Sequence, residues 1–449
     1  MSAVRRAGWI AGLAAFAVSV TAPAAWAAGA AHWVEAWYAP PFPTTAVWGC
    51  NQQRTFTHQS VRQTVQLEAG GNRVRIRLTN ELGLSPVRFA EVTVAASSPT
   101  GVLEAGTVHV VTFRGKRGGV IPTGKAWVSD PIDMEVHRFE NIAISVYYPS
   151  GATPAGQLKH VWVSPPGNHV TQLVWPQGGR PQAPELANGV EVSTAKPRPV
   201  LVAFGDSITK GFCSTAGMHL GYPEQLARLL AARSAVRRWV VINSGISGNR
   251  LLHDGAGPKA LERFGRDALD IPGVRAIVLL EGINDIGWAY DPDGDTGPIP
   301  ASAIIGAYRD LIRRAHARGI KIYLGTLTPY LGSTYERPAG EKVRQQVNAW
   351  IRKGRGFNGV IHFDGALRDP RHPHHYIGGD QCGDDLHPND IGYHIMAETV
   401  YNELFAPGKS LARDATPPRG WNAAPRHPPA TARARRPASS HRAREPGGR

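Results

Sequence analysis

Hydrophobic and polar residues alternate along much of residues 30–193 with the period of two that is typical of β-strands. Arg73–Thr79 alternates strictly, which predicts a strand with one buried face. Similar short runs predict further strands at Val61–Leu67, Phe89–Ala95, Gly106–Phe113, Ile142–Tyr148 and Leu158–Val163. Turn residues separate these runs, and no convincing amphipathic helix interrupts them. The pattern therefore predicts an all-β, jelly-roll-like sandwich.

The period changes beyond Pro181–Arg198, a proline-containing segment with few large apolar residues that is interpreted as a linker. Buried-strand patterns are found at Val200–Phe204, Val240–Asn243, Ala276–Leu280, Ile320–Gly325 and Val360–Phe363. Helical patterns alternate with them at Tyr222–Ala232, Ala301–Ala317, Gly340–Lys353 and Asp390–Phe405. This alternation predicts an α/β domain with a mostly parallel sheet that is covered on both faces.

The 449 residues are too many for one ordinary core, and the first residues differ from the rest. Arg5 and Arg6 precede an apolar stretch, Ala7–Val20, and the small-residue ending Ala25–Ala28. This is the pattern of a secretory signal peptide, and no stretch is long enough for a membrane span. We expect a secreted or periplasmic protein, exported by either the Sec or the Tat route. The predicted organisation is a signal peptide at 1–28, a β-sandwich at 29–195, an α/β domain at 196–407 and a tail at 408–449.

The formal net charge of +15 is concentrated at the ends of the chain. The first 28 residues contribute two positive charges, and the segment from Lys409 onward contributes eight, which leaves about five for the rest. A nucleic-acid partner is therefore not expected. The Pro/Arg-rich tail is predicted to be disordered and to contact anionic polymers of the cell envelope.

Ser207 is the candidate nucleophile, because it directly follows a predicted strand and precedes a glycine-rich loop. In open α/β sheets, ligands bind at this end of the strands. A serine needs a base, and the base needs a group that orients it. His387 is the candidate base, with Asp384 as its orienting carboxylate and Asp385 as the alternative. Taken singly, these residues are equally typical of turns and helix caps.

Two further segments follow predicted strands and offer donors for a developing oxyanion. Asn243–Asn249 contains Gly245 and Gly248, whose backbone can approach a substrate closely. Glu281–Asp285 contains the side-chain amide of Asn284. Either segment alone is also typical of an ordinary strand-to-helix turn.

Together, these residues resemble the SGNH hydrolases, also called GDSL esterases or lipases. The matching blocks are Gly205–Ile208, Gly248, Gly282–Asp285 and Asp384–Pro388, in family order over roughly residues 200–405. The resemblance implies a flavodoxin-like α/β/α fold and no cofactor. It also implies a Ser207, His387 and Asp384 triad, with an oxyanion hole made by the Ser207 and Gly248 backbone and Asn284. The β-rich half lies outside these blocks, but its position is similar to the jelly-roll that precedes some secreted SGNH carbohydrate esterases.

Cys213 and Cys382 are predicted to form a disulfide if the serine and histidine loops meet, since each lies five or six residues from a triad member. Cys50 lies in the other half of the chain. The alternative is that all three cysteines are free and buried.

Several aromatic and histidine residues are open to two interpretations. Trp288 and Tyr290 either line the substrate pocket or pack the loop after Asn284. Three further tryptophans could stack against a sugar, but we predict that they are core residues: Trp33, Trp37 and Trp48. The histidine-rich group of His372, His374, His375 and Asp380 fits no standard zinc spacing and is interpreted as a surface loop.

These features predict a serine ester hydrolase that removes O-acetyl or other O-acyl groups from a carbohydrate. One alternative is a lipase or arylesterase that acts on simple or lipid esters. The other is a polysaccharide-binding protein without catalytic activity, against which the complete set of candidate catalytic residues counts.

Overall fold

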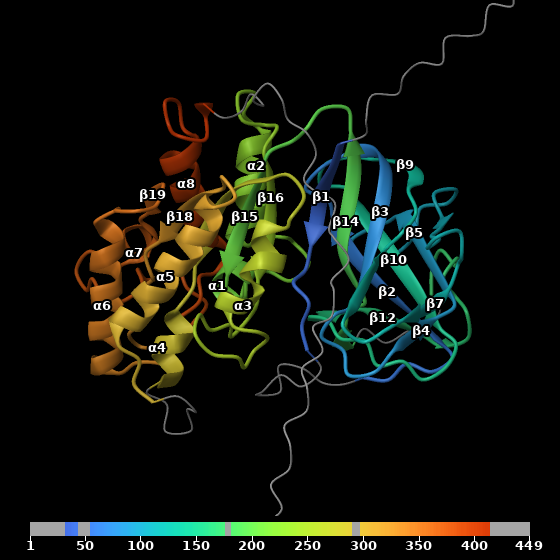
Figure 1. The fold of residues 1–449 in the computed structure, drawn as a ribbon, viewed down its shortest axis with the longest axis horizontal. Helices are drawn as coiled ribbons and strands as arrows, with labels where there is room; N and C mark the ends of the chain where they lie inside the picture. The colour runs from blue at the N-terminus through green and yellow to red at the C-terminus, as the bar shows by residue number, and fades with distance from the viewer. Residues whose placement is uncertain (1–31, 44–53, 176–180, 290–296, 414–449) are drawn as a thin grey trace, which may run out of the picture. The chain divides into compact units, whose positions relative to one another are not determined.

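The computed structural model describes residues 32–43, 54–175, 181–289 and 297–413 (Figure 1). The first part of the described chain is built of strands, and one of its sheets has the order β1-β14-β3-β8, with β9 also paired to β3. These strands are β1 (His32–Tyr38), β3 (Gly71–Asn80), β8 (Lys125–Val128), β9 (Ile132–Val136) and β14 (Ala187–Thr194). The predicted alternation in β3 is confirmed, because Val74, Ile76 and Leu78 are fully buried.

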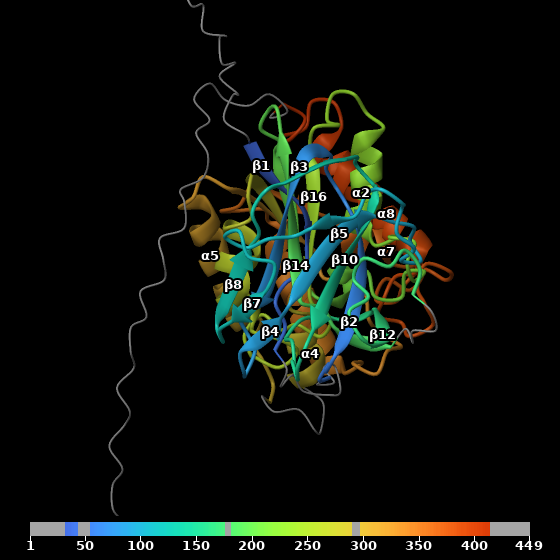
Figure 2. The ribbon, with the colours of Figure 1, turned by 90° about the vertical axis from the view of Figure 1, so that its right-hand side faces the viewer.

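A second sheet has the order β12-β2-β10-β5-β6 (Figure 2). Its strands are β2 (Gln59–Gln66), β5 (Glu91–Ala96), β6 (His109–Val110), β10 (Asn141–Tyr148) and β12 (Trp162–Pro166). Two short pairs join β4 (Val87–Phe89) to β7 (Gly119–Ile121) and β11 (Leu158–His160) to β13 (Gln182–Pro184). All these pairings are antiparallel, which is consistent with the predicted sandwich. Jelly-roll connectivity stays a prediction.

Two local predictions in this part are wrong. The segment interpreted as a linker contains β14, which lies between β1 and β3 in its sheet. In β14, the only fully buried large apolar residues are Val190 and Val192. The small residues beside them weaken the strand pattern in the sequence. The strand expected at Gly106–Phe113 is reduced to β6, because the chain turns at Gly106, where φ is +82°.

The second part of the chain contains a parallel sheet with the order β16-β15-β17-β18-β19. Its strands are β15 (Val200–Gly205), β16 (Val240–Gly245), β17 (Val274–Leu280), β18 (Lys321–Gly325) and β19 (Gly359–Ile361). All five lie where the sequence predicts strands. Every residue of β15 is buried, as expected for the central region of a sheet that is covered on both faces. The order is that of flavodoxin-like folds, with a switch point between β15 and β17.

The helices form two groups, because right-handed crossovers that run in opposite directions from β15 place their helices on opposite faces. On one face α2 (Tyr222–Ala231) packs against α8 (Asp390–Val400), and on the other α5 (Ala301–His316) packs against α3 (Ala260–Phe264) and α6 (Pro338–Arg352). The shorter helices are α1 (Ser207–Lys210), α4 (Ile283–Ala289), α7 (Phe363–Leu367) and the π-helical turns η1 (Gly265–Leu269) and η2 (Tyr401–Phe405). The four predicted helices are confirmed, and α3 with η1 lies between β16 and β17, where no helix was predicted.

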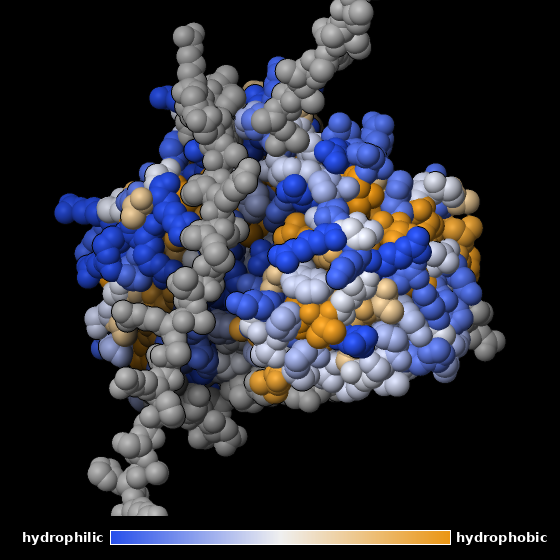
Figure 3. Space-filling model, turned by 45° about the vertical axis from the view of Figure 1, so that its right-hand side comes forward, coloured by the Kyte–Doolittle hydropathy of each residue, from blue (hydrophilic) through white to orange (hydrophobic). Residues whose placement is uncertain are grey.

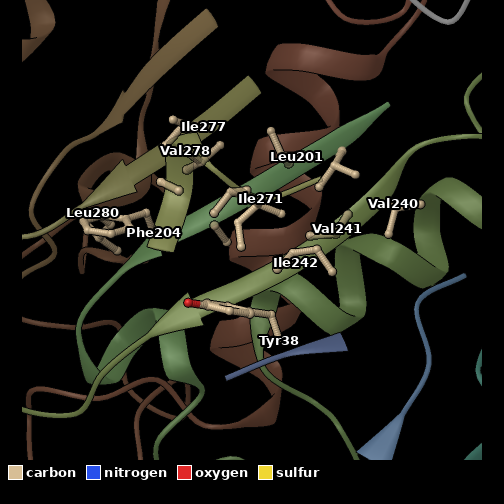
Figure 4. Close-up of a cluster of buried hydrophobic side chains, with 14 of the residues drawn as sticks. Tyr38, Leu201, Phe204, Val240, Val241, Ile242, Ile271, Ile277, Val278 and Leu280 are labelled. Atoms are coloured by element: carbon tan, nitrogen blue, oxygen red, sulfur yellow. The ribbon is translucent and has the colours of Figure 1, made fainter. Parts of the chain in front are cut away.

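Described residues from His32 onward belong to one compact unit. Apolar side chains of β15, β16 and β17 pack in a buried cluster, and Tyr38 of β1 lies alongside Ile242 (Figure 4). The Tyr38 hydroxyl donates a hydrogen bond of 2.7 Å to the Asp267 carboxylate. The β-rich part therefore contributes directly to the packing of the parallel sheet, and the division at residue 195 stays a prediction.

The folded chain extends beyond the predicted domain end. Residues 408–413 were assigned to the tail, but Leu411 is fully buried and its N–H donates to the Leu404 carbonyl. The prediction is wrong for these six residues, because a single buried leucine in a polar segment is too weak a signal. The predicted signal peptide at residues 1–28 and the predicted tail from residue 414 onward lie outside the described residues. On the face in Figure 3, apolar side chains lie in several separate places among polar ones. In the part of the chain that the structure describes, no helix has both the length and the apolar character that a membrane span requires.

Candidate active site

Ser207 begins α1 immediately beyond β15, at the switch point of the sheet. Asp206 caps this short helix, because its Oδ1 accepts the Ile208 N–H at 2.9 Å. Gly205 is required at the end of β15, since a Cβ there would lie 2.1 Å from Thr209 Oγ1 and 2.3 Å from the Leu280 carbonyl oxygen. The tight turn leaves the Ser207 side chain at the edge of the sheet with 6% of its surface exposed.

The loop before α8 brings His387 to Ser207. Ser207 Oγ lies 2.7 Å from His387 Nε2, and His387 Nδ1 lies 2.6 Å from Asp384 Oδ2. Because the carboxylate only accepts, Nδ1 carries the proton and Nε2 is the acceptor for the Ser207 hydroxyl. The Cys382 N–H donates to the His387 carbonyl at 3.1 Å, which fixes the turn of the loop. The three predicted triad residues therefore form one connected chain of hydrogen bonds.

Asp384, rather than Asp385, faces the imidazole. Asp384 Oδ1 accepts the N–H groups of Leu386 and His387 at 3.0 and 2.9 Å, so both of its oxygens are engaged. Asp385 has a φ of +54°, and its Oδ1 instead accepts the side-chain amide of Gln381 at 3.0 Å. Partial burial raises the pKa of Asp384, but the hydrogen bonds from His387 and Leu386 outweigh burial and lower that pKa to about 2. Asp384 is thus a carboxylate across the whole range in which an ester hydrolase works.

A disulfide joins the serine and histidine loops. Cys213 and Cys382 are bonded, with their Cα atoms 6.1 Å apart. The residue before Cys213, Phe212, places its ring centroid 4.6 Å from that of His387 and remains 50% exposed. Cys50 lies outside the described residues. The disulfide therefore connects the segment that contacts the imidazole to the loop that carries it.

Gly248 follows β16 and has a φ of +73°, a conformation that favours glycine. The next residue, Asn249, is fully buried and holds the turn through its side chain. Its Nδ2 donates to the carbonyls of Ala256 and Pro258 at 3.1 and 2.9 Å. The backbone beside Gly248 is therefore fixed before any substrate binds.

Asn284 lies at the start of α4 and is 2% exposed. Its Nδ2 donates to the Asn249 carbonyl at 2.8 Å, which connects α4 to the Gly248 turn. Asp285 adds a second connection, because its carboxylate accepts the N–H groups of Leu251 and Leu252 at 2.6 and 2.9 Å. The two segments proposed as oxyanion donors thus form one hydrogen-bonded unit.

A buried arginine that the sequence did not single out supports this unit. Arg263 has no exposed side-chain surface and donates to the carbonyls of Gly205 and Ser244, at the ends of β15 and β16. Its Nε also donates to Asn249 Oδ1 at 2.7 Å. Arg263 lies in α3, a helix that the sequence analysis did not predict, and no motif distinguishes it from a surface arginine.

Buried carboxyl groups surround Arg263. Glu281 Oε1 lies 3.4 Å from Arg263 Nη2 and Asp267 Oδ2 lies 3.5 Å from Nη1. Burial raises the pKa of Glu281, and it raises that of Asp206 to about 7 and that of Asp285 to about 6. The buried region beneath Ser207 therefore contains more acidic than basic side chains.

Trp288 is 3% exposed and packs with Phe42, Ile246 and Ala256, which is the packing role that the sequence left open. Tyr290 and Trp48 lie outside the described residues. Trp33 and Trp37 are half-buried, and the Arg75 guanidinium lies 3.9 Å from the Trp33 ring centroid.

No described group of residues forms a convincing metal site. Among the residues that the structure describes, the one cluster with suitable side chains is Cys213, Cys382 and Asp384, and both of its sulfur atoms belong to the disulfide. His372, His374 and His375 lie on an exposed loop, as predicted, with His374 Nδ1 2.8 Å from Glu341 Oε1.

Comparison with known proteins gives a family match over part of the chain. A model described as the GDSL-like Lipase/Acylhydrolase family matches residues 203–395. Among solved structures, a putative lipolytic protein of the G-D-S-L family from Desulfitobacterium hafniense DCB-2 is 19% identical, covering 45% of this chain and 98% of that one, with a TM-score of 0.35. The acetyl xylan esterase AlAXEase is 20% identical over 45% and 98%, with a TM-score of 0.36. Axe2, an acetylxylan esterase from Geobacillus stearothermophilus, is 20% identical over 45% and 93%, with a TM-score of 0.37. No curated protein matches the chain.

Proposed function

Since residues 203–395 belong to the GDSL-like Lipase/Acylhydrolase family, we propose that the protein is a serine ester hydrolase whose acyl-enzyme forms on Ser207. The observation that carries the proposal is the continuous contact from Ser207 Oγ to His387 Nε2 and from His387 Nδ1 to Asp384 Oδ2. The same contact argues against a non-catalytic binding protein. A histidine held in this tautomer beside a serine can activate the serine as a nucleophile, whereas stabilising a turn does not require this arrangement.

In the first half of the reaction, Ser207 Oγ bonds to the acyl carbon while its proton moves to His387 Nε2. The imidazolium that results is stabilised by the Asp384 carboxylate at 2.6 Å. When the tetrahedral intermediate collapses, the bond to the leaving alcohol breaks, and His387 returns the proton to the departing oxygen. Water then attacks the acyl-enzyme with His387 as base, and the proton returns to Ser207 as the acid is released.

The negative charge of each tetrahedral intermediate needs donors that are already in place. We assign this role to the backbone N–H groups of Ser207 and Gly248 and to the Asn284 amide. This assignment is supported by the hydrogen bonds of Asn249, Asp285 and Arg263, which anchor the Gly248 turn. A preorganised donor set needs little reorganisation during the reaction, which is the main advantage of such a site over water.

The substrate that we propose is an O-acylated carbohydrate, with acetyl as the acyl group. Three features favour it: the β-rich part in front of the hydrolase domain, the predicted export of the chain, and the half-exposed ring of Phe212 beside His387. A half-exposed aromatic ring offers a flat apolar face against which a sugar ring can pack. We further propose that residues 1–28 are removed on export and that the tail contacts anionic envelope polymers.

The test of the chemistry is Ser207→Ala, compared with Ser214→Ala as a nearby control. Ser214 lies in the same loop, and its hydroxyl donates to the Gly211 carbonyl at 2.7 Å. Loss of the nucleophile should reduce kcat on p-nitrophenyl acetate by on the order of 10⁶, whereas the control should keep its activity. Undiminished turnover by Ser207→Ala would refute the proposal.

The test of the substrate is acetate release from acetylated polysaccharides, measured beside hydrolysis of p-nitrophenyl esters of increasing chain length. We expect efficient acetate release and a steep fall in kcat/KM as the acyl chain grows. A preference for long acyl chains, without release of acetate from polysaccharide, would favour the lipase alternative.

A further inference from the structure

A chain of hydrogen bonds from two aromatic side chains ends on Asn284. Trp288 Nε1 donates to the Tyr335 hydroxyl at 2.6 Å, and this hydroxyl donates to Asn284 Oδ1 at 2.9 Å. On its other side, the amide donates from Nδ2 to the Asn249 carbonyl at 2.8 Å. Tyr335 lies in the segment between β18 and α6, about 50 residues beyond Asn284 in sequence, and it belongs to no recognised motif.

The direction of these bonds follows from the chemistry of the groups. An indole N–H can only donate, so the Tyr335 hydroxyl oxygen accepts from Trp288 and keeps its own proton for Asn284 Oδ1. A carbonyl can only accept, so the Asn249 carbonyl requires the amide nitrogen. If the Asn284 amide were rotated by 180°, two acceptor oxygens would face each other at about the present 2.8 Å. The contacts therefore select one orientation of the amide.

Packing holds Tyr335 where this chain of bonds needs it. A Cβ on Gly287 would lie 2.2 Å from the Tyr335 ring, so the absence of a side chain on α4 at this position allows the ring to approach. The ring also packs against the buried cluster of Phe42, Ile246, Ala256 and Trp288. Tyr335 is thus held between α4 and a cluster that contains a residue from the β-rich part.

We propose that Tyr335 is a positioning residue that holds the Asn284 amide with its nitrogen toward the oxyanion. The inference rests on the proposed function, in which the second N–H of Asn284 Nδ2 stabilises the tetrahedral intermediate. Trp288 contributes indirectly, because its N–H orients the Tyr335 hydroxyl. Tyr335 touches neither the substrate nor the triad in this proposal, and its effect on the reaction passes through Asn284.

The test is a double-mutant cycle with Tyr335→Phe and Asn284→Ala, in which kcat and KM are measured separately on p-nitrophenyl acetate. Asn284→Ala should lower kcat by about 10² to 10³, the usual loss for one oxyanion donor. Tyr335→Phe keeps the ring and should lower kcat by a smaller factor, about 5 to 50, with little change in KM. In the Asn284→Ala background, Tyr335→Phe should have no further effect, because the amide that it positions is already gone.

A matched control is Tyr323→Phe, which removes a hydroxyl bonded to Ser410 Oγ at 2.8 Å, and we expect its kcat to equal that of the unmodified protein. Thermal unfolding of each variant separates lost stability from lost positioning.

Three outcomes would overturn the inference, and they are distinguishable. If Tyr335→Phe lowers kcat equally with and without Asn284, its effect does not pass through the amide. If Asn284→Ala lowers kcat and Tyr335→Phe leaves it unchanged, only the role of Tyr335 fails. If Asn284→Ala itself leaves kcat unchanged, the oxyanion assignment in the proposed function fails together with the role of Tyr335.

Discussion

Replacing Asp384 by asparagine tests how the structure sets the tautomer of His387. Asp384 Oδ1 accepts two backbone N–H groups, those of Leu386 and His387, and Oδ2 accepts the imidazole Nδ1–H. An asparagine at this position has one oxygen and one NH₂ group. The two backbone donors select the oxygen, so the NH₂ group must face His387 Nδ1. The imidazole then has to accept at Nδ1 and carry its proton on Nε2, where it can no longer accept the Ser207 proton.

The size of the effect follows from this change of tautomer. An Asp-to-Asn change that leaves the geometry of a Ser-His-Asp triad intact lowers kcat by about 10⁴. That factor corresponds to about 5 kcal/mol in the activation free energy. Asp384→Ala should lose less than Asp384→Asn, because the Asp384 side chain is 40% exposed and water can occupy the vacated position. Water donates or accepts as required, so it does not impose the wrong tautomer.

The assay is steady-state hydrolysis of p-nitrophenyl acetate by the two Asp384 variants and by Asp385→Asn as a matched control. Asp385→Asn should keep most of the activity, since its side chain is bonded to Gln381 and not to the imidazole. Circular dichroism of each variant would show whether the fold is retained. The reasoning is refuted if Asp384→Asn retains kcat within about tenfold of the unmodified protein, a loss of less than about 1.4 kcal/mol. It is also refuted if Asp385→Asn is the more damaging change.

Three further changes test other parts of the structure. Replacing Cys213 and Cys382 by serine removes a bond across 169 residues, which should lower the free energy of unfolding by up to about 5 kcal/mol in non-reducing urea titrations. Unchanged stability would contradict a bond in the folded protein. Burial raises the pKa of Asp206 to about 7, so its contribution to stability is complete below its ordinary value of about 4 and is lost as the pH rises to about 7. The melting temperature of Asp206→Asn should therefore change less over that range than the melting temperature of the unmodified protein, and equal slopes would count against it. Phe212→Ala should lower kcat/KM more on acetylated polysaccharide than on p-nitrophenyl acetate, whereas equal losses would indicate that Phe212 acts only through His387.

The sequence by itself determined the regular elements of the α/β part, because their patterns are local. A buried parallel strand such as Val200–Phe204 is an unbroken apolar run, and a helix such as Ala301–His316 repeats its apolar residues every three to four positions. The sequence pattern did not predict β14, whose place between β1 and β3 depends on partners more than 100 residues away in the chain. Small residues that are buried by such partners leave no local pattern.

The candidate site divides in the same way. Ser207, His387, Asn284 and the Asp384 or Asp385 pair could be named from short motifs, since a motif fixes residue types near one turn. Only the tertiary structure shows that Asp384, and not Asp385, faces His387. The path of the loop depends on which donors each carboxylate accepts, and the motif does not specify them. The tertiary structure also brought Arg263 and Tyr335 to the site. Their roles depend on contacts between segments far apart in sequence, and a buried arginine or a bridging tyrosine has no local pattern that marks it.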